Sequence, residues 1–178
     1  MQIRPATPVD ARPLAEVHIA SWRAAYVGQV PDDYLAGLSV DRREDMWQDI
    51  LGGSNAGAGG STLVLTEGGG GDHGAEAIVG FASIGASRDA DAEPGVGEVM
   101  GIYLAPEHWD RGGGRLLMKE ALHRLRGQGF TTATLWVLDT NARAQHFYQA
   151  GGWVADGATK TDDLRGFALS EVRYRRSL

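Results

Sequence analysis

The chain has 178 residues, of which 43% are hydrophobic and 22% charged, a size and composition that fit one globular domain with its own core. Its net charge of −6 and the lack of a long basic stripe argue against a nucleic-acid partner, and no apolar run approaches the length of a membrane span. The chain has no cysteine, which excludes disulfides and thiolate nucleophiles. We therefore expect a cytoplasmic protein with neither a nucleic-acid nor a membrane partner.

The first part of the sequence predicts one short strand and two helices. Residues 2–4 suit a strand, and Pro8 and Asp10 suit the start of a helix, in which small and apolar residues recur at helical spacing. A turn at 30–39 follows, with room for one helical turn. Residues 39–51 combine a serine or aspartate cap with an apolar stripe, which predicts a second helix.

The rest of the sequence alternates strands and helices. Residues 61–67 and 75–87 predict an antiparallel hairpin, and the glycine-rich segments 52–60 and 68–74 are typical of flexible loops. The further elements that we expect are strands at 98–106, 131–139, 152–157 and 166–176, and helices at 112–126 and 141–151. This order predicts a mixed α/β sheet in one domain, 1–178, with a single parallel crossover in its middle.

Three consecutive glycines, Gly112, Gly113 and Gly114, stand where a predicted strand leads into a predicted helix. Glycine costs about 1 kcal/mol against alanine inside a helix, so the turn must need the backbone itself. Unpaired N–H groups at a helix start favour a phosphate or diphosphate, and the flanking Arg111 and Arg115 add positive charge. From this stretch alone a simple helix cap is an equal alternative, because neither a GxxxxGK[ST] loop nor a full G-x-G-x-x-G fingerprint is present.

Four segments stand out along the chain: "IRPATPVDARPLAEVHIASWRAAYVGQVPDDYL", "GEVMGIYLAPEHWDRGGGRLLMKEAL", "TLWVLDTNARAQHFYQAGGW" and "SEVRYRR". In order and spacing they resemble the GNAT superfamily of acyl-CoA-dependent N-acyltransferases. The resemblance implies one N-acetyltransferase domain with an about seven-stranded mixed sheet flanked by helices, whose splayed central strands hold acyl-CoA. It also implies that an acetyl group moves from acetyl-CoA to a primary amine by direct attack in a ternary complex.

One position departs from the family pattern Q/R-x-x-G-x-G/A. Trp109 takes the first place of that pattern and is followed by Asp110 and Arg111. Binding that depends on backbone N–H groups should survive this change, with Trp109 either covering the diphosphate or packing beside the turn. Asp110 brings a negative charge near the phosphates, which is unfavourable unless Arg111 or Arg115 offsets it.

The resemblance also assigns roles to residues at the cofactor. It implies that the backbone of Ile102 and Leu104 pairs with the pantetheine arm and that an N–H there stabilises the developing oxyanion. Asn141 would hydrogen-bond the pantetheine, and Tyr148, two helical turns further on, would protonate the departing thiolate. The alternatives are core packing for the two strand residues, a helix cap for Asn141 and a half-buried ring for Tyr148.

The acceptor side is less well defined by the sequence. An alkyl amine must lose a proton before it attacks, and the best candidate base is Glu98, for which a solvent-facing strand residue is an equal alternative. Trp22, Tyr26 and Tyr34 are expected to form part of an acceptor pocket and in part to pack the helices. His18 lies on an apolar helix face and is expected in the core.

Two classes of function remain open at this point. The first is an N-acetyltransferase that acts on a small-molecule or peptide amine, and the alternative is a non-catalytic acyl-CoA-binding or sensing module, against which Tyr148 argues. No H-x-x-x-H motif or carboxylate cluster indicates a metal. A homodimer through the C-terminal strands fits the family, and the basic residues Arg173, Arg175 and Arg176 are expected at a solvated strand edge.

Overall fold

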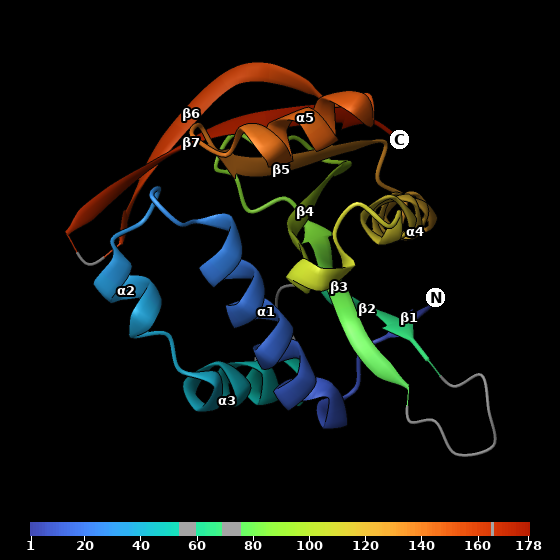
Figure 1. Ribbon diagram of the computed structural model, residues 1–178. Coiled ribbons are helices and arrows are strands. Elements are labelled where there is room, and N and C mark those ends of the chain that lie inside the picture. Colours follow the sequence, from blue (N-terminus) through green and yellow to red (C-terminus); the bar gives the residue numbers. More distant parts are fainter. Residues whose placement is uncertain (54–59, 69–75, 165) are drawn as a thin grey trace.

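The structure is a computed structural model that describes residues 1–53, 60–68, 76–164 and 166–178. The described residues form a seven-stranded sheet in the order β1-β2-β3-β4-β5-β7-β6 (Figure 1). Its strands are β1 (Gln2–Pro5), β2 (Ser61–Glu67), β3 (Ala77–Ala86), β4 (Val96–Leu104), β5 (Thr132–Leu138), β6 (Val154–Leu164) and β7 (Phe167–Ser177). The predicted glycine-rich loops fall largely on 54–59 and 69–75, outside the described residues.

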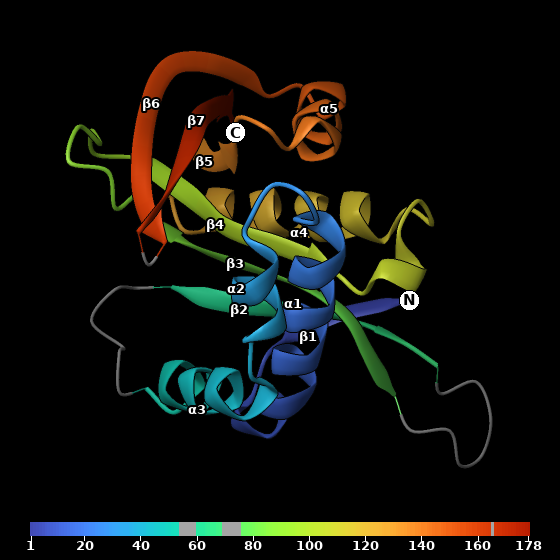
Figure 2. The ribbon, with the colours of Figure 1, turned by 60° about the vertical axis from the view of Figure 1, so that its left-hand side comes forward.

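The helices cover both faces of the sheet (Figures 1 and 2). They are η1 (Pro8–Asp10), α1 (Ala11–Ala25), α2 (Asp32–Ala36), α3 (Val40–Leu51), η3 (Pro106–His108), α4 (Gly113–Gly127) and α5 (Ala142–Ala150). α1 and α3 pack on one face, whereas α4 and α5 pack on the other. The mixed sheet and the predicted helices are thereby confirmed, including the single helical turn at α2.

Two polar contacts fix the N-terminal helices. Arg4 on β1 makes a bidentate ion pair with Asp10, with distances of 2.7 and 2.8 Å, and Asp10 also accepts a hydrogen bond of 2.7 Å from the backbone N–H of Thr7. Ser39 caps α3 by accepting from the N–H of Arg42 at 3.3 Å. Ser39 satisfies an N–H group at the start of α3, as the sequence predicts, and Asp10 satisfies the N–H of Thr7 at the start of η1.

The last hairpin differs from the prediction. β6 was expected to end at Gly157, but it continues to Leu164. The pairing of β6 with β7 shifts register between Ala155 and Thr159, and Gly157 has a φ of +87° within that irregularity. The glycine therefore marks a β-bulge rather than the end of a strand. Because β6 is an edge strand with mostly exposed polar residues, hydrophobic alternation could not reveal its second half.

The central strands separate along their length. β4 and β5 are parallel and pair only at Val96–Glu98 with Thr132–Thr134. β4 shifts register against β3 opposite the step from Ser83 to Ile84, so the strand bends where it leaves β5. Beyond this point β4 pairs only with β3, and β5 pairs only with β7. The expected splay is thus confirmed.

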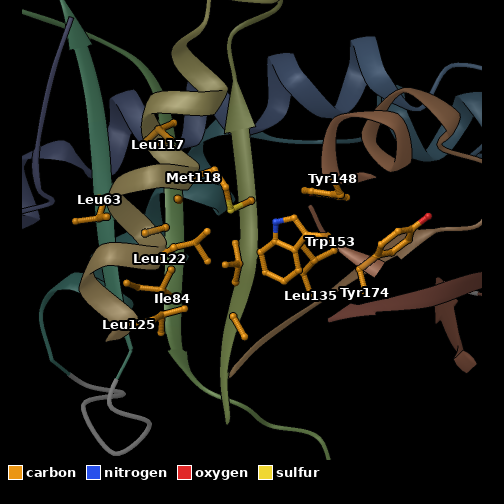
Figure 3. Packing of buried hydrophobic residues seen from close by; sticks show 14 of the residues in the cluster. Leu63, Ile84, Leu117, Met118, Leu122, Leu125, Leu135, Tyr148, Trp153 and Tyr174 are labelled. Carbon is orange, nitrogen blue, oxygen red and sulfur yellow. The ribbon is translucent and has the colours of Figure 1, made fainter. Parts of the chain in front are cut away.

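The larger hydrophobic core joins the two sides of the splay. Figure 3 shows Leu117, Met118, Leu122 and Leu125 of α4 packed over the β2–β4 side, and Tyr148, Trp153 and Tyr174 gathered at the β5–β7 side. A smaller core, which includes Leu14, Trp47 and Phe81, lies between α1, α3 and the opposite face. Both edges of the splay are therefore held by packed side chains.

Candidate active site

The backbone of β4 faces the gap between β4 and β5 at alternate residues. The N–H of Ala105 donates to the carbonyl of Val79 on β3 at 2.9 Å, so the residues that share its hydrogen-bonding direction turn toward β3. Ile102 and Leu104 have the opposite direction, and their N–H and C=O groups point into the gap. Their side chains pack on the larger core. The packing considered for these residues is confirmed, and the pairing of their backbone with pantetheine stays a prediction.

The glycine turn leads from this edge into α4. Gly112 is the N-cap of α4 with a φ of +87°, in the left-handed region that glycine occupies without strain. A Cβ on Gly113 would lie 2.7 Å from Leu65 and 2.9 Å from Leu104, so the helix start lies directly on the sheet. The first intrahelical bond from this region is Leu116 N–H to Gly112 C=O. The N–H groups of Gly113 and Gly114 therefore have no partner within the helix and can donate to an anion.

Charged side chains surround the turn. Arg111 and Arg115 are exposed and make no ion pair with any described residue. Asp110 pairs with Arg143 of α5 at 2.9 Å, and not with Arg111 or Arg115. Since Arg143 holds the carboxylate, Arg111 and Arg115 remain available to a bound anion.

Trp109 packs beside the turn. Its indole Nε1–H donates to the carbonyl oxygen of Leu104 at 2.9 Å, and the guanidinium of Arg143 lies 4.4 Å from the centre of its ring. Of the two roles considered for Trp109, the structure supports packing. The indole occupies the Leu104 carbonyl and leaves the N–H of that residue directed at the gap.

The two predicted residues at the ends of α5 have different surroundings. Asn141 is the N-cap, and its Oδ1 accepts from the N–H of Ala144 at 3.1 Å, which confirms the capping interpretation. Tyr148 is buried against Trp153 and Tyr174, with ring centres 6.3 and 6.2 Å away. Burial raises the pKa of the Tyr148 phenol, so the group remains a proton donor at neutral pH. A role for Asn141 at pantetheine stays a prediction.

Glu98 lies on β4 just before β4 and β5 separate, but its carboxylate is already paired with Arg88. The side chain is buried, and both carboxylate oxygens contact Arg88: Oε1 accepts from Nη2 at 2.6 Å and Oε2 from Nε at 3.1 Å. Oε2 also accepts from the backbone N–H of Arg88 at 3.0 Å. Glu98 is therefore neither solvent-facing nor free, and it can accept a proton from an amine only if Arg88 moves away.

The three predicted aromatic residues lie together on the α1 face. The Trp22 ring is 4.8 Å from Tyr26 and 6.3 Å from Tyr34 between centres. His18 lies 6.1 Å from Trp22 and 4.6 Å from Tyr103 of β4. Burial, with a contribution from the Arg43 charge, lowers the pKa of His18 to about 3, so His18 is neutral and belongs to the core as expected.

Two residues of this face were not predicted from the sequence. Tyr103 links the cluster to β4, next to Ile102, and alternation along a strand that also carries cofactor contacts could have indicated it. Glu171 of β7 contributes through its negative charge to the raised pKa of Tyr26, for which burial is the larger cause. A carboxylate in a C-terminal edge region gives no signal in the sequence, because only the hairpin brings it to this face.

The basic C-terminal cluster was wrongly placed at a solvated edge. Arg173 is buried and contacts Asp91 at 2.7 Å, Asp156 at 2.8 Å and Asp89 at 3.1 Å. These ion pairs raise the pKa of Arg173 and join the connector between β3 and β4 to the β6–β7 hairpin. The physical reason for the error is that the partners come from distant segments.

In the part of the chain that the structure describes, no three His, Asp or Glu side chains come close enough to hold a metal ion. Within the same residues no helix has both the length and the apolar character needed to cross a membrane.

The model of the acetyltransferase (GNAT) family matches residues 23–153, and the chain belongs to that family. Its members are acyltransferases, and so is this protein. The uncharacterized N-acetyltransferase YuaI of Bacillus subtilis is 32% identical over 148 residues, which cover 83% of this chain and 77% of that protein.

Solved structures of the same fold agree with the observed architecture. The PaiA N-acetyltransferase from Thermoplasma acidophilum in complex with coenzyme A superposes with a TM-score of 0.69 at 18% identity, over 99% of this chain and 98% of that one. YncA, a putative acetyltransferase from Salmonella typhimurium with its cofactor acetyl-CoA, gives 0.67 at 20% identity, over 99% and 93% of the two chains. At these identities the likeness is one of fold.

Proposed function

We propose that the protein binds acetyl-CoA in the gap between β4 and β5 and transfers its acetyl group to a primary amine. The observation that carries this proposal is the set of backbone donors at the two parts of the site, the N–H groups of Ile102 and Leu104 at the gap and those of Gly113 and Gly114 at the start of α4. Such a set of donors fits an extended amide-bearing arm that ends in a diphosphate. The coenzyme A and acetyl-CoA named for the two structures of like fold support the same cofactor.

The residues of the site fit the chemical parts of acetyl-CoA. The diphosphate would meet the N–H groups of the glycine turn, with Arg111 and Arg115 supplying positive charge. The pantetheine amides would pair with Ile102 and Leu104, and the free amide nitrogen of Asn141 can add a donor. When bound, the thioester supplies an activated acetyl group to this chain.

The chain itself supplies orientation and proton transfer. A β4 N–H in the gap polarises the thioester carbonyl, and holding both reactants in one cleft lowers the barrier by up to about 7–11 kcal/mol. Tyr148 is the proposed acid for the departing thiolate, because burial keeps its phenol protonated. Glu98 stays the predicted base, on the condition that Arg88 releases it.

The acceptor is proposed to enter on the α1 face, beside Trp22, Tyr26 and Tyr34. The rings offer an apolar wall, and the negative charge of Glu171, which acts on Tyr26, suits a cationic amine. The absence of cysteine supports action in the cytoplasm. A homodimer stays a prediction.

The experiment is thiol release from acetyl-CoA with a panel of small amines and peptides, comparing the wild type with Tyr148→Phe. The proposal predicts amine-dependent release by the wild type and a large loss in the variant. Saturable binding of acetyl-CoA without release across the panel would instead support the sensing module.

A further inference from the structure

A primary amine of the protein itself lies on the α1 face, where the acceptor is proposed to enter. The Lys160 Nζ of β6 is 3.0 Å from Oε2 of Glu171 and 4.6 Å from the ring centre of Trp136. Asp162 Oδ2 lies 3.9 Å away from the same nitrogen. The Trp136 ring is fixed by its own hydrogen bond, Nε1–H to Asp89 at 2.9 Å. A carboxylate and an aromatic face thus form a binding site for one ammonium group, here called the ammonium site.

The alternation of side chains along the strands places this ammonium site on the α1 face. On β5, Leu135 and Val137 belong to the core under α4 and α5, so Trp136 between them points to the other face. On β7, Val172 belongs to the same core, and Glu171 next to it therefore points away from it. Lys160 lies directly opposite Glu171 in the β6–β7 ladder. The hairpin itself curves toward the side that carries α1 and α2 (Figures 1 and 2).

The ammonium site lies close to the point along β5 where β4 and β5 separate. The last parallel pair joins Glu98 to Thr134, and Trp136 is the next β5 residue on the same face. The Lys160 amine contacts Glu171 of β7 and the ring of Trp136 on β5, the strand that borders the gap. The charge of Glu171 also reaches Tyr26 and Tyr103, both of which have a raised pKa chiefly through burial. The Lys160 amine therefore shares the surroundings proposed for an acceptor.

We propose that Lys160 is an internal acceptor that the protein acetylates itself. The inference rests on the proposed acetyltransferase function. Glu171 takes one proton from the ammonium and passes it to solvent, and the neutral Nζ then attacks the thioester carbonyl. The C–N bond forms, the C–S bond breaks, and the second N–H proton ends on the sulfur of coenzyme A. The product is an uncharged amide that no longer pairs with Glu171.

The chain offers its own control for this reaction. Lys119 and Lys160 are the two lysines of the sequence, and Lys119 is exposed on α4, away from the α1 face. Simple chemical acetylation by acetyl-CoA should modify the exposed lysine at least as fast as the paired one. Selective modification of Lys160 is therefore a signature of the site.

The test is incubation of the purified protein with acetyl-CoA and no added amine, followed by intact mass measurement and peptide mapping. The wild type and Lys119→Arg are both expected to gain one acetyl group at Lys160. In the wild type Lys160 should react about tenfold or more faster than Lys119, as expected for an amine held near the thioester. Lys160→Arg, which keeps the charge, should gain none there, and Glu171→Gln should slow the reaction. The rate per molecule should not change on dilution.

Other results separate the proposal from its premise. Transfer to external amines with Lys160 unmodified would overturn self-acetylation and leave the acetyltransferase function standing. Equal modification of both lysines, or a rate that falls with dilution, would also overturn it. If neither Lys160 nor any external amine acquires an acetyl group, the proposed function fails and the self-acetylation fails with it.

Discussion

The indole Nε1–H of Trp109 donates a 2.9 Å hydrogen bond to the carbonyl oxygen of Leu104. This contact joins the glycine turn to the last residue of β4, so the two parts of the proposed acyl-CoA site are positioned together. A side chain that breaks the family pattern thereby contributes to the geometry of the site.

Trp109→Phe is expected to lower the free energy of unfolding by about 1 kcal/mol, because the Leu104 carbonyl loses its donor while an aromatic ring remains under Arg143. The loosened turn should weaken coenzyme A binding several-fold. Urea denaturation and calorimetric titration measure the two effects. Unchanged affinity in a destabilised variant would show that the turn does not depend on this contact.

Gly112→Ala and Gly114→Ala form a matched pair. Gly112 has a φ of +87°, where an L-residue costs about 1–2 kcal/mol, whereas a Cβ on Gly114 would meet Phe147 at an ordinary 3.5 Å. The first variant should lose stability and coenzyme A affinity, and the second should keep both. Calorimetric titration of both proteins with coenzyme A decides, and equal affinities would contradict the proposed role of the turn.

Tyr148→Phe should reduce kcat by about 100-fold or more while the Kd for acetyl-CoA stays nearly unchanged, because the proton donor is lost and the packing against Trp153 and Tyr174 is kept. Since burial raises the pKa of this phenol, the wild-type rate should not fall between neutral pH and pH about 9 through its ionisation. Steady-state kinetics across that range tests both statements. A variant with full kcat would remove Tyr148 from the reaction.

Glu98→Gln tests the predicted base against its observed contacts. If Glu98 accepts the amine proton, the variant loses kcat together with the acidic limb of the kcat/KM pH profile. Arg88→Gln is the control, because it frees the carboxylate and should leave that limb in place. Loss of stability in both variants, with the pH profile unchanged in Glu98→Gln, would identify the pair as an anchor for the connector between β3 and β4.

Asp10 should make the fold depend on acid. The Arg4 hydrogen bonds, together with those from Thr7, lower the pKa of Asp10 to about 2, although burial opposes the change. A depressed carboxylate pKa stabilises the fold fully above its unfolded value near 4, by about 2 kcal/mol, and this is lost as the pH falls toward 2. Asp10→Asn should therefore be less stable at neutral pH and show a flatter decline in this window. Urea denaturation as a function of pH would contradict this if the two curves ran parallel.

The sequence allowed the sheet, the crossover and the glycine turn to be predicted, because hydrophobic period and helix-start residues are local signals. It did not reveal the partners of the charged residues. Arg143 of α5 pairs with Asp110 before α4, and the aspartates that pair with Arg173 come from two segments, the connector between β3 and β4 and strand β6. Such contacts depend on tertiary placement, which periodicity does not encode. The second half of β6, and with it Lys160, was not predicted because its residues are mostly exposed and polar and show no hydrophobic alternation.

The central claim is that the parted strands and the glycine turn together bind acyl-CoA. An NMR titration of nitrogen-labelled protein with coenzyme A tests it most directly, since each backbone amide reports separately. We predict saturable shifts of the amides of Ile102, Leu104, Gly113 and Gly114. A folded protein in which these amides do not move, or in which saturable shifts gather elsewhere, would contradict the account.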